Sequence, residues 1–561
     1  MLRINELKLP LHHNDDELRT AIIEKLAITA DELLSFNVFK RSYDARKKSS
    51  ILLIYQLDVS LNQEVESRIL NAEQKHNAIR QSPDTDYHFV AKANKNFPQP
   101  NQQRPIIIGF GPCGMLAALL LAQMGLKPIV LERGQDVRQR TKDTWGLWRE
   151  RKLNTESNVQ FGEGGAGTFS DGKLYSQVKD KRHLGRKVLN EFVTAGAPEE
   201  ILFISKPHIG TFKLVKMVEN MRAEITRLGG EVRFNQKVER IHRAPASSSD
   251  ASTETPTLAD KQGCITGLSL SNGETIKSRH IVLAIGHSAR DSFQMLLEQD
   301  VYIEPKPFSI GFRIEHPQSV IDTARFGSEA GNPILGAADY KLVHHCKDGR
   351  SVYSFCMCPG GTVVAATSEE GAVVTNGMSQ YSRNERNANA AIVVGIEPEK
   401  DYPNHILAGI DLQRKLEKRA YELGGSDYSA PAQLVGDFLR NKPSKTTASV
   451  TPSYQPGIKL GDLSKALPDF AVKAIREAIP EFNKKIKGFS MNDAMLTGVE
   501  TRTSSPICIK RGKDFNSINT QGLYPAGEGA GYAGGILSAA IDGIKVAEAL
   551  AIDLLKVEIT S

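Results

Sequence analysis

The sequence predicts an α/β protein with a parallel central sheet, and two glycine-rich segments near opposite ends of the chain carry this prediction. Residues 105–133 read as an apolar strand, a Gly-x-Gly-x-x-Gly turn, an apolar helix and a second strand that ends at an acidic residue. Residues 522–550 read as a short strand, another glycine-rich turn and a long helix. Strand–turn–helix units of this kind align their strands in parallel and direct a helix N-terminus toward a ligand.

The first turn has the residues that a bound pyrophosphate requires. Gly109 permits the tight turn, Gly111 lets the backbone approach the phosphates, and Gly114 lets the helix pack closely on the strand. Glu132 ends the second strand, where a carboxylate accepts a hydrogen bond from an adenosine ribose hydroxyl. A glycine-rich turn alone is weak evidence, but a strand, a helix and an acid in register predict a dinucleotide site.

The C-terminal segment resembles the second FAD motif of the glutathione-reductase-like flavoprotein superfamily. The resemblance implies that Glu528, after Gly527, holds the ribityl and phosphate region of FAD. It also implies that the helix N-terminus at Gly534, Gly535 and Ile536 faces the pyrimidine edge of the flavin, where its positive end stabilises the reduced ring. The alternative is that these glycines only let a strand and a helix pack together.

Residues 280–289 resemble the strand and Ala-Thr-Gly return of the same superfamily, with Ile285 in place of the threonine and Gly286 at the turn. The three elements follow the order that the superfamily has. Together they imply that the tightly bound dinucleotide is FAD rather than NAD.

A third glycine-rich segment, residues 161–174, is expected to lie against the flavin. Its closely spaced glycines leave bare backbone, as a loop must when it covers a planar cofactor. Thr168 and Ser170 add hydroxyl groups, and Lys173 adds a cation. The alternative interpretation is a flexible surface loop.

A closer resemblance rests on five motifs, at residues 162–174, 206–211, 311–317, 356–361 and 500–506. Together they are similar to a family of uncharacterised bacterial FAD-dependent dehydrogenases, or NAD(P)/FAD-dependent oxidoreductases, over nearly the whole chain. The resemblance implies the fold, the FAD cofactor and a redox activity, but no substrate. The residues expected to contact FAD are Gly109, Gly111, Pro112, Gly114, Glu132, Arg133, Gly164, Gly165, Thr168, Ser170, Lys173, Val238, Gly286, Gly527, Glu528, Gly534, Gly535 and Ile536.

The chain is long enough for two or three domains. We expect an N-terminal ferredoxin-like α+β domain in residues 1–93, a polar linker in 94–104, a discontinuous Rossmann-like FAD-binding domain in 105–295 and 500–555, and an inserted α+β substrate (cap) domain in 296–499.

Within these domains the patterns predict individual elements. In the first they are strands at 2–10, 35–40 and 50–59, helices at 15–25 and 63–77, and a last strand at 87–91. In the FAD-binding domain they are a helix at 211–228, one strand over 231–242, an exposed disordered excursion at 244–263, and strands at 264–269 and 274–276 around a Ser-Asn-Gly turn.

Two residues are candidates for catalysis. Arg502 precedes the C-terminal FAD motif and could clamp a substrate carboxylate, although a structural salt bridge explains it equally well. His208 could act as a general acid or base, although a capping or core histidine is the simpler interpretation. Arg313 and Glu315 share one face of an expected strand, which could be a substrate wall or a surface ladder.

The cysteines suggest little redox or metal chemistry. Residues 134–175 lack the paired cysteines of the superfamily's disulfide reductases, which excludes that mechanism. Cys356 and Cys358 are expected to be buried reduced thiols, with a reducible disulfide or one reactive thiol as the alternative. The 344–346 His-His-Cys run lacks zinc-site spacing, so no metal is expected.

No second Gly-x-Gly-x-x-Gly turn followed by a helix occurs in residues 176–500. A dedicated NAD(P) domain is therefore not expected. NAD(P)H could still bind transiently against the flavin, or another reductant could replace it.

Composition bounds the partners and the compartment. A net charge of +6 on 561 residues suggests no polyanion partner. Six cysteines are too few for a disulfide scaffold, the N-terminus lacks a signal-peptide core, and the apolar run at 115–122 is too short to cross a bilayer. These features predict a cytoplasmic protein without membrane contact.

The leading hypothesis is an FAD-dependent oxidoreductase that acts on a small metabolite under the inserted domain. One alternative is an FAD-dependent RNA-modifying enzyme that uses the basic turn at residues 40–48, although a solvated hairpin end explains those charges more simply. Another is a non-catalytic FAD-binding or electron-transfer protein. Oligomeric state is not readable from the chain.

Overall fold

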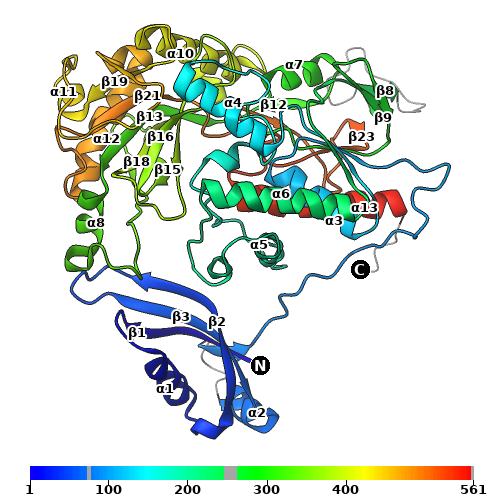
Figure 1. The fold of residues 1–561 in the computed structure, drawn as a ribbon, viewed down its shortest axis with the longest axis vertical. Helices are drawn as coiled ribbons and strands as arrows, with labels where there is room; N and C mark the ends of the chain where they lie inside the picture. The colour runs from blue at the N-terminus through cyan, green and yellow to red at the C-terminus, as the bar shows by residue number, and fades with distance from the viewer. Residues whose placement is uncertain (73–77, 246–261, 557–561) are drawn as a thin grey trace.

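The computed structural model describes residues 1–72, 78–245 and 262–556. Figure 1 shows a narrow N-terminal unit below a larger body, in which the helices α3 (Pro112–Gln123), α6 (Thr211–Arg227) and α13 (Ile536–Leu555) lie beside a second, mostly antiparallel sheet. The expected α/β class with a parallel sheet is confirmed. Among the helices of these described ranges, none combines the length and apolar composition that a bilayer crossing requires.

The N-terminal unit is a four-stranded antiparallel sheet with two helices. The strands follow the order β2-β3-β1-β4, and the elements follow the expected order β-α-β-β-α-β. The last strand is not at residues 87–91, because Ile79–Gln81 pairs with the free edge of β1 instead and Tyr87 donates a hydrogen bond to Glu548. The elements are β1 (Leu2–Pro10), α1 (Asp15–Leu26), β2 (Leu33–Asp44), β3 (Leu52–Leu61), α2 (Gln63–Ala72) and β4 (Ile79–Gln81).

The body is organised by a five-stranded parallel sheet with the order β24-β11-β5-β6-β7. Its strands are short and almost entirely apolar, as expected for strands that are buried on both faces. Ile107 packs toward one hydrophobic cluster, whereas Ile106 and Ile108 pack toward another. The strands are β5 (Ile106–Ile108), β6 (Ile129–Leu131), β7 (Glu231–Arg233), β11 (Ile281–Leu283) and β24 (Leu523–Pro525).

Different elements pack on the two faces of this sheet. The cluster around Ile107 is completed by α3 (Pro112–Gln123), α5 (Leu184–Thr194), α6 (Thr211–Arg227) and α13 (Ile536–Leu555). The opposite face is covered by β8 (Val238–Pro245), β9 (Gly263–Leu270) and α7 (Arg290–Glu298); β10 (Thr275–Lys277) and β23 (Thr520–Gln521) pair with β9.

The single strand predicted over 231–242 is wrong. The chain leaves β7 at residue 233, and β8 belongs to a different sheet. Between them Asn235 adopts a φ of +56° and donates its backbone N–H to Gly134 O, so the chain turns where it caps the end of β6. The excursion predicted at 244–263 lies mostly outside the described residues; Pro245 and Gly263, at its two ends, are paired.

The second sheet of the body has seven strands in the order β14-β15-β18-β13-β21-β19-β20. Its central strand is buried over nearly its whole length. The strands are β13 (Phe308–Pro317), β14 (Val343–His345), β15 (Ser351–Cys358), β18 (Asn387–Ile396), β19 (Ala430–Leu434), β20 (Ile458–Leu460) and β21 (Met495–Glu500), and the accompanying helices are α8 (Gln318–Phe326), α10 (Ala408–Gly424), α11 (Val435–Leu439) and α12 (Asp469–Lys485).

Smaller elements complete the body. A two-stranded sheet of β16 (Gly361–Ala365) and β17 (Thr375–Ser379) packs against β15 and β18, and β12 (Ile303–Pro305) pairs with β22 (Ile507–Ile509). Helix α4 (Val137–Glu150) follows the parallel strand β6, and α9 (Pro398–Asp401) follows β18.

The N-terminal unit is attached to the body by backbone and aromatic contacts. Arg41 exchanges backbone hydrogen bonds with Phe203 and Ser205, at 2.6 and 2.9 Å. The ring of Tyr43 meets Phe326 of α8 edge to face. The chain then runs from Gln81 to Ile106 without a helix or strand, as the polar composition of residues 94–104 suggested for that part of it.

A close contact between α3 and α13 gives a test of the packing. A Cβ at Gly543 would lie 2.2 Å from Cys113 O, so we expect Gly543→Ala to lower the free energy of unfolding by about 1–3 kcal/mol despite alanine's better helix propensity. Gly146→Ala in α4 is the matched control, because its nearest contact would be an ordinary 3.4 Å. Urea unfolding should show the control unchanged or stabilised by up to about 1 kcal/mol. Equal effects at both positions would contradict the α3–α13 packing.

Candidate functional site

The predicted pyrophosphate turn has the backbone geometry that its glycines suggested. Gly109 has a φ of +97°, and a Cβ there would lie 2.4 Å from Ala284 O. A Cβ at Gly114 would lie 2.0 Å from Gly109 O. Helix α3 then starts at Pro112 without a side-chain cap at Gly111. Its first N–H groups are therefore open to an anion.

Glu132 connects this turn to two other segments. The carboxylate is buried and accepts hydrogen bonds from the backbone N–H groups of Phe110 at 2.8 Å, Gly134 at 2.9 Å and Gly162 at 3.0 Å. A carboxylate has four acceptor positions, so one remains for a ligand hydroxyl. Glu132 thus organises the backbone of the site, a role that its spacing in the sequence did not reveal.

The 161–174 loop packs directly on the turn. Gly164 donates its N–H to Phe110 O at 2.8 Å, and a Cβ at Gly165 would lie 2.8 Å from Gly111 Cα. A Cβ at Gly167 would meet Ile536, at 3.0 Å. The loop therefore lies between the N-termini of α3 and α13, which argues against the interpretation as a flexible surface loop.

A buried arginine that the sequence analysis did not select, Arg140, holds the backbone of this loop and of the residues just before it by hydrogen bonds. Arg140 is fully buried and donates hydrogen bonds to the backbone carbonyls of Asn158, Val159 and Glu163. Burial lowers the pKa of Arg140 to about 10. The position of Arg140 on α4, well before the loop in sequence, gave no signal for this contact.

The C-terminal motif lies beside the N-terminus of α3 and the turn at Gly286. A Cβ at Gly527 would lie 2.9 Å from Cys113 Cβ, and one at Gly529 would lie 2.3 Å from Gly286 O. Glu528 lies 3.5 Å from His287, another residue that sequence reasoning did not select. Gly534 and Gly535 are exposed, and a Cβ at either would meet nothing within 4 Å.

These features fit a dinucleotide cofactor. Two helix N-termini without N-cap side chains converge, and bare glycine backbone surrounds them. Gly286, with a φ of +70°, also faces open space. The remaining predicted contacts divide: Thr168 and Ser170 make hydrogen bonds within the loop, Arg133 is paired with Glu156 and Asp291, and Val238 is a core residue behind the sheet.

The five motifs used for the family resemblance meet at one polar cluster. Asp171 and Lys173 come from the 161–174 loop, His208 from the segment that pairs with it, Arg313 from β13, Cys356 and Cys358 from β15, and Glu500 from the end of β21. Arg383, which no motif contained, completes the cluster.

Buried ion pairs fix this cluster. Asp171 contacts the Lys173 ammonium at 2.7 Å and the Arg383 guanidinium at 2.5 and 2.9 Å. Burial raises the pKa of Asp171, but the two cations prevail and hold it below its usual range. Arg313 makes a two-bond pair with Glu500, at 2.9 and 3.0 Å. Arg313 and Glu315 are both buried, so they are not a surface ladder.

A cavity of 420 Å³ borders the cluster at Arg383. It is lined by polar groups and bare backbone, including Gln318, Asp322, Asn332 and Glu385. A small polar molecule in this cavity would therefore approach the cluster from the side of Arg383.

His208 lies in the cluster in a neutral state. Its Nε2 donates to Tyr381 O at 2.9 Å, and its ring stacks on that of Tyr381. Burial, and then the nearby Arg383, lowers the pKa of His208 to about 4. A neutral imidazole with one nitrogen committed to a carbonyl is a poor proton donor at pH 7, which favours the structural interpretation.

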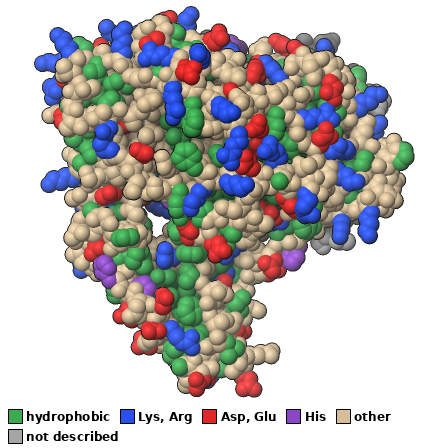
Figure 2. All heavy atoms as spheres, viewed as in Figure 1, with side chains coloured by type: hydrophobic (Ala, Val, Ile, Leu, Met, Phe, Trp, Pro, Cys, Tyr) green, Lys and Arg blue, Asp and Glu red, His purple; other side chains and the backbone are tan. Residues whose placement is uncertain are grey.

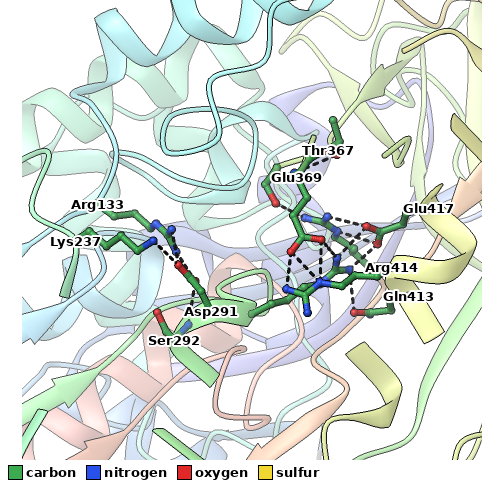
Figure 3. A network of polar contacts seen from close by, with 12 residues as sticks. Arg133, Lys237, Asp291, Ser292, Thr367, Glu369, Gln413, Arg414 and Glu417 are labelled. Atoms are coloured by element: carbon green, nitrogen blue, oxygen red, sulfur yellow. Dashed lines mark hydrogen bonds and ion pairs between the residues drawn. The ribbon is translucent and has the colours of Figure 1, made fainter. Parts of the chain in front are cut away.

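Arg502 belongs to a separate buried network around Glu417, which Figure 3 shows beside Gln413 and Glu369. The Arg502 guanidinium donates to Glu417 at 2.9 and 3.2 Å and to Ser368 at 2.7 Å. Glu417 also accepts two hydrogen bonds from Arg290, at 2.6 and 3.0 Å. The Arg502 guanidinium is therefore already paired, with Glu417 of α10. The structure contains the structural salt bridge that the sequence analysis gave as the alternative to a substrate clamp.

The basic turn at 40–48 is the end of the β2–β3 hairpin. Arg46, Lys47 and Lys48 are exposed, and Arg46 pairs with Asp44. The face of the N-terminal unit seen in Figure 2 carries mainly hydrophobic and acidic side chains. That face offers no continuous basic surface to a nucleic acid.

One group of potential metal ligands lies away from the site. His344, Cys346 and Glu477 bring one ligand atom each within 4.8 Å of one another, and His344 Nε2 lies 3.1 Å from Glu477. The sequence suggested no metal site, because Glu477 comes from the distant helix α12.

Comparisons with known proteins identify the family. Residues 307–503 match a domain family described as "FAD-dependent protein, C-terminal domain-like", and residues 1–60 match a domain of unknown function. A protein of Clostridium beijerinckii, described as an uncharacterized protein, is 46% identical over 550 residues, 98% of each chain. The chain therefore belongs to the same family as this Clostridium protein. The seven-stranded sheet and helix α10 lie within the matched residues 307–503.

Solved flavoproteins are only distantly similar. A flavoprotein/dehydrogenase from Cytophaga hutchinsonii is 12% identical, with a TM-score of 0.36 over 82% of this chain and 80% of that one. A glycerol-3-phosphate dehydrogenase from Bacillus halodurans, complexed with FAD, is also 12% identical, with a TM-score of 0.34 over 82% and 66%. Likeness at this level supports no functional inference.

The Glu417 network gives a stability test. Glu417→Gln leaves the buried Arg502 without its carboxylate partner and leaves Arg290 with Glu369 alone, so we expect the free energy of unfolding to fall by about 3–5 kcal/mol. Arg414→Met removes a partly exposed pair with Glu369 and should cost less than about 1 kcal/mol. Urea unfolding of both variants measures the difference, and similar losses would show that the Glu417 network is not the stabilising one.

The depressed pKa of His208 gives a pH test. The unfolded chain binds a proton near pH 6.5, whereas folded His208 binds one near pH 4, so stability is lost as the pH falls between these values. We expect His208→Gln to lose less stability than the wild type between pH 7 and pH 5, as measured by urea unfolding at each pH. His12→Gln, at an exposed position, is the control. An unchanged pH dependence in His208→Gln would mean that the folded pKa is not depressed.

Proposed function

We propose that the protein is an FAD-dependent oxidoreductase that acts on a small polar metabolite. The observation that carries the proposal is the convergence of the family motifs. Three glycine-rich segments surround two uncapped helix N-termini, and the same 161–174 loop continues into the Asp171–Lys173 cluster. One loop therefore connects the place for a cofactor to a place for a substrate.

The residues of the cofactor site have distinct tasks in this proposal. The N-termini of α3 and α13 receive the pyrophosphate and the flavin, and Glu132 keeps the loops that flank them in register. FAD, when bound, supplies two-electron chemistry and hydride transfer. The chain's own residues orient the substrate and exclude water.

The substrate is held at the polar cluster. The Lys173 ammonium has three N–H groups and contacts the Asp171 carboxylate, so it has capacity for an anionic group of a ligand. Arg313 and Arg383 add positive charge, balanced in part by Asp171 and Glu500. This charge pattern favours a small anionic metabolite.

Cofactor binding is tested at Gly534. A side chain there would meet no protein atom within 4 Å, so Gly534→Leu should fold normally but fill space that the flavin needs. We expect the purified wild type to show flavin absorption, and Gly534→Leu to lose at least tenfold in FAD affinity in a titration followed by flavin fluorescence. Gly461→Leu, at an equally open position in the seven-stranded sheet region, should bind FAD as the wild type does.

Activity is tested by anaerobic mixing of the FAD-loaded protein with a metabolite panel and with NADH and NADPH. Bleaching of the flavin absorption by at least one compound is expected, and Lys173→Met should slow bleaching by an anionic one. A protein that binds FAD but is bleached by nothing would contradict an oxidoreductase and favour a non-catalytic FAD-binding protein.

A further inference from the structure

Two cysteines of the polar cluster lie at an irregularity of the sheet. Strand β15 pairs regularly with β18 up to Phe355, and the register then shifts before Cys358. Cys356, within this bulge, has a φ of +43°, in the left-handed region that residues other than glycine rarely adopt. Bulges of this kind redirect side chains and are frequent beside active sites.

Buried polar groups hold Cys356 in this conformation. Arg313 Nη1 donates to Cys356 O at 3.1 Å, and the Cys358 thiol donates to the same oxygen at 3.4 Å. Arg313 is itself fixed by Glu500 and by Asn389 at 2.7 Å. A strained backbone persists where its surroundings over-determine it, and such sites are often functional.

The bulge places the two thiols against each other in different environments. Cys358 is fully buried, whereas the Cys356 residue is partly exposed. The single S–H proton of Cys358 is within reach of both the backbone oxygen and the side chain of Cys356. A partly exposed cysteine beside a fully buried one is the arrangement that an attacking and a resolving cysteine need.

The charges around Cys356 favour its thiolate. Lys173 and Arg313 act on it from the loop and from β13, Glu500 opposes them from β21, and Tyr175 also faces it. The hydrogen bond from Cys358, aided by both cations, outweighs burial and lowers the pKa of Cys356 to about 6. The pKa of Cys358 is raised well above its usual value, so the pair shares one proton near pH 7.

The other buried cysteines lack this environment. Burial raises the pKa of Cys346 to about 11, and burial also raises that of Cys113. Of the four cysteines compared, Cys356 therefore has the most thiolate character, which controls cysteine reactivity.

We propose that Cys356 and Cys358 form a redox-active dithiol that exchanges with small disulfides, with Cys356 as the attacking thiolate and Cys358 as the resolving thiol. The Cys356 thiolate attacks one sulfur of the small disulfide, whose S–S bond breaks and releases a first thiolate. Cys358 then loses its proton and attacks Cys356 Sγ. This forms the Cys356–Cys358 bond and releases the second thiolate. Two electrons pass from the protein to the small disulfide, which leaves as two thiols.

This inference rests on the proposed function, because a bound flavin would exchange electrons with the Cys356–Cys358 pair. The site then takes thiol or disulfide compounds as a substrate class. The cysteine-free segment after the first FAD motif excludes the arrangement of the superfamily's disulfide reductases, but not a pair supplied by β15.

Alkylation of the FAD-loaded full chain tests the thiolate. With iodoacetamide at pH 7 we expect Cys356 to be modified at least tenfold faster than Cys264 and Cys508, which are also partly exposed. Peptide mass spectrometry gives the rates, and their pH profile should have its midpoint near 6. Lys173→Met should move that midpoint upward, whereas Lys152→Met, at an exposed pair with Glu150, should not. A Cys356 that reacts no faster than Cys264 and Cys508 would overturn the inference.

Glutathione disulfide tests the pair. The wild type should form the intramolecular disulfide, Cys358→Ser should accumulate glutathione on Cys356, and Cys356→Ser should form neither product. Cys346→Ser is the matched control and should behave as the wild type. If no glutathione adduct formed on Cys356 in Cys358→Ser, the proposal would be wrong.

The same samples separate this inference from the proposed function, because flavin absorption is read independently of the thiols. Loaded protein with inert thiols refutes the dithiol alone. Reactive thiols in protein that cannot bind FAD would support the dithiol and refute the oxidoreductase proposal.

Discussion

The buried carboxylate of Glu132 is the interaction on which the site depends. Its oxygens accept hydrogen bonds from the backbone N–H groups of Phe110, Gly134 and Gly162, which lie in the first turn, just after β6 and in the 161–174 loop. Glycine backbone is costly to order, so such segments need an anchor. Arg140 provides a second anchor, because its guanidinium donates hydrogen bonds to the carbonyls of Gly162 and Glu163 in the 161–174 loop.

The loop fixed in this way joins two kinds of chemistry. Near Gly165 it lies on the N-terminus of α3, and at Asp171 and Lys173 it enters a cluster of ion pairs that includes residues of the seven-stranded sheet. Buried charges of both signs stabilise each other only in defined geometry, so the cluster fixes the position of the loop against that sheet. A second network, around Glu417, ties α7 to α10 independently.

The sequence described the glycine-rich turns better than the surroundings of the two catalytic candidates. Glycines report backbone geometry directly, because a Cβ at Gly109 or Gly114 is sterically excluded, and the convergence of their segments followed from the order of the strands. Arg502 and His208 were chosen by residue type and position alone. Their partners, Glu417 and Tyr381, lie far away in sequence. A local sequence pattern cannot predict a partner that becomes a neighbour only through tertiary folding.

The sequence by itself determined the parallel sheet, the glycine turns and the order β-α-β-β-α-β of the N-terminal unit, because these follow from local periodicity and from steric limits on single residues. It also singled out the five motifs. Only the tertiary structure decided that these motifs meet, that Arg313 and Glu500 pair, and that Cys356 occupies a strained bulge beside Lys173. The reason is physical: charge pairing and burial depend on distances through space, and those are set by how the two sheets pack.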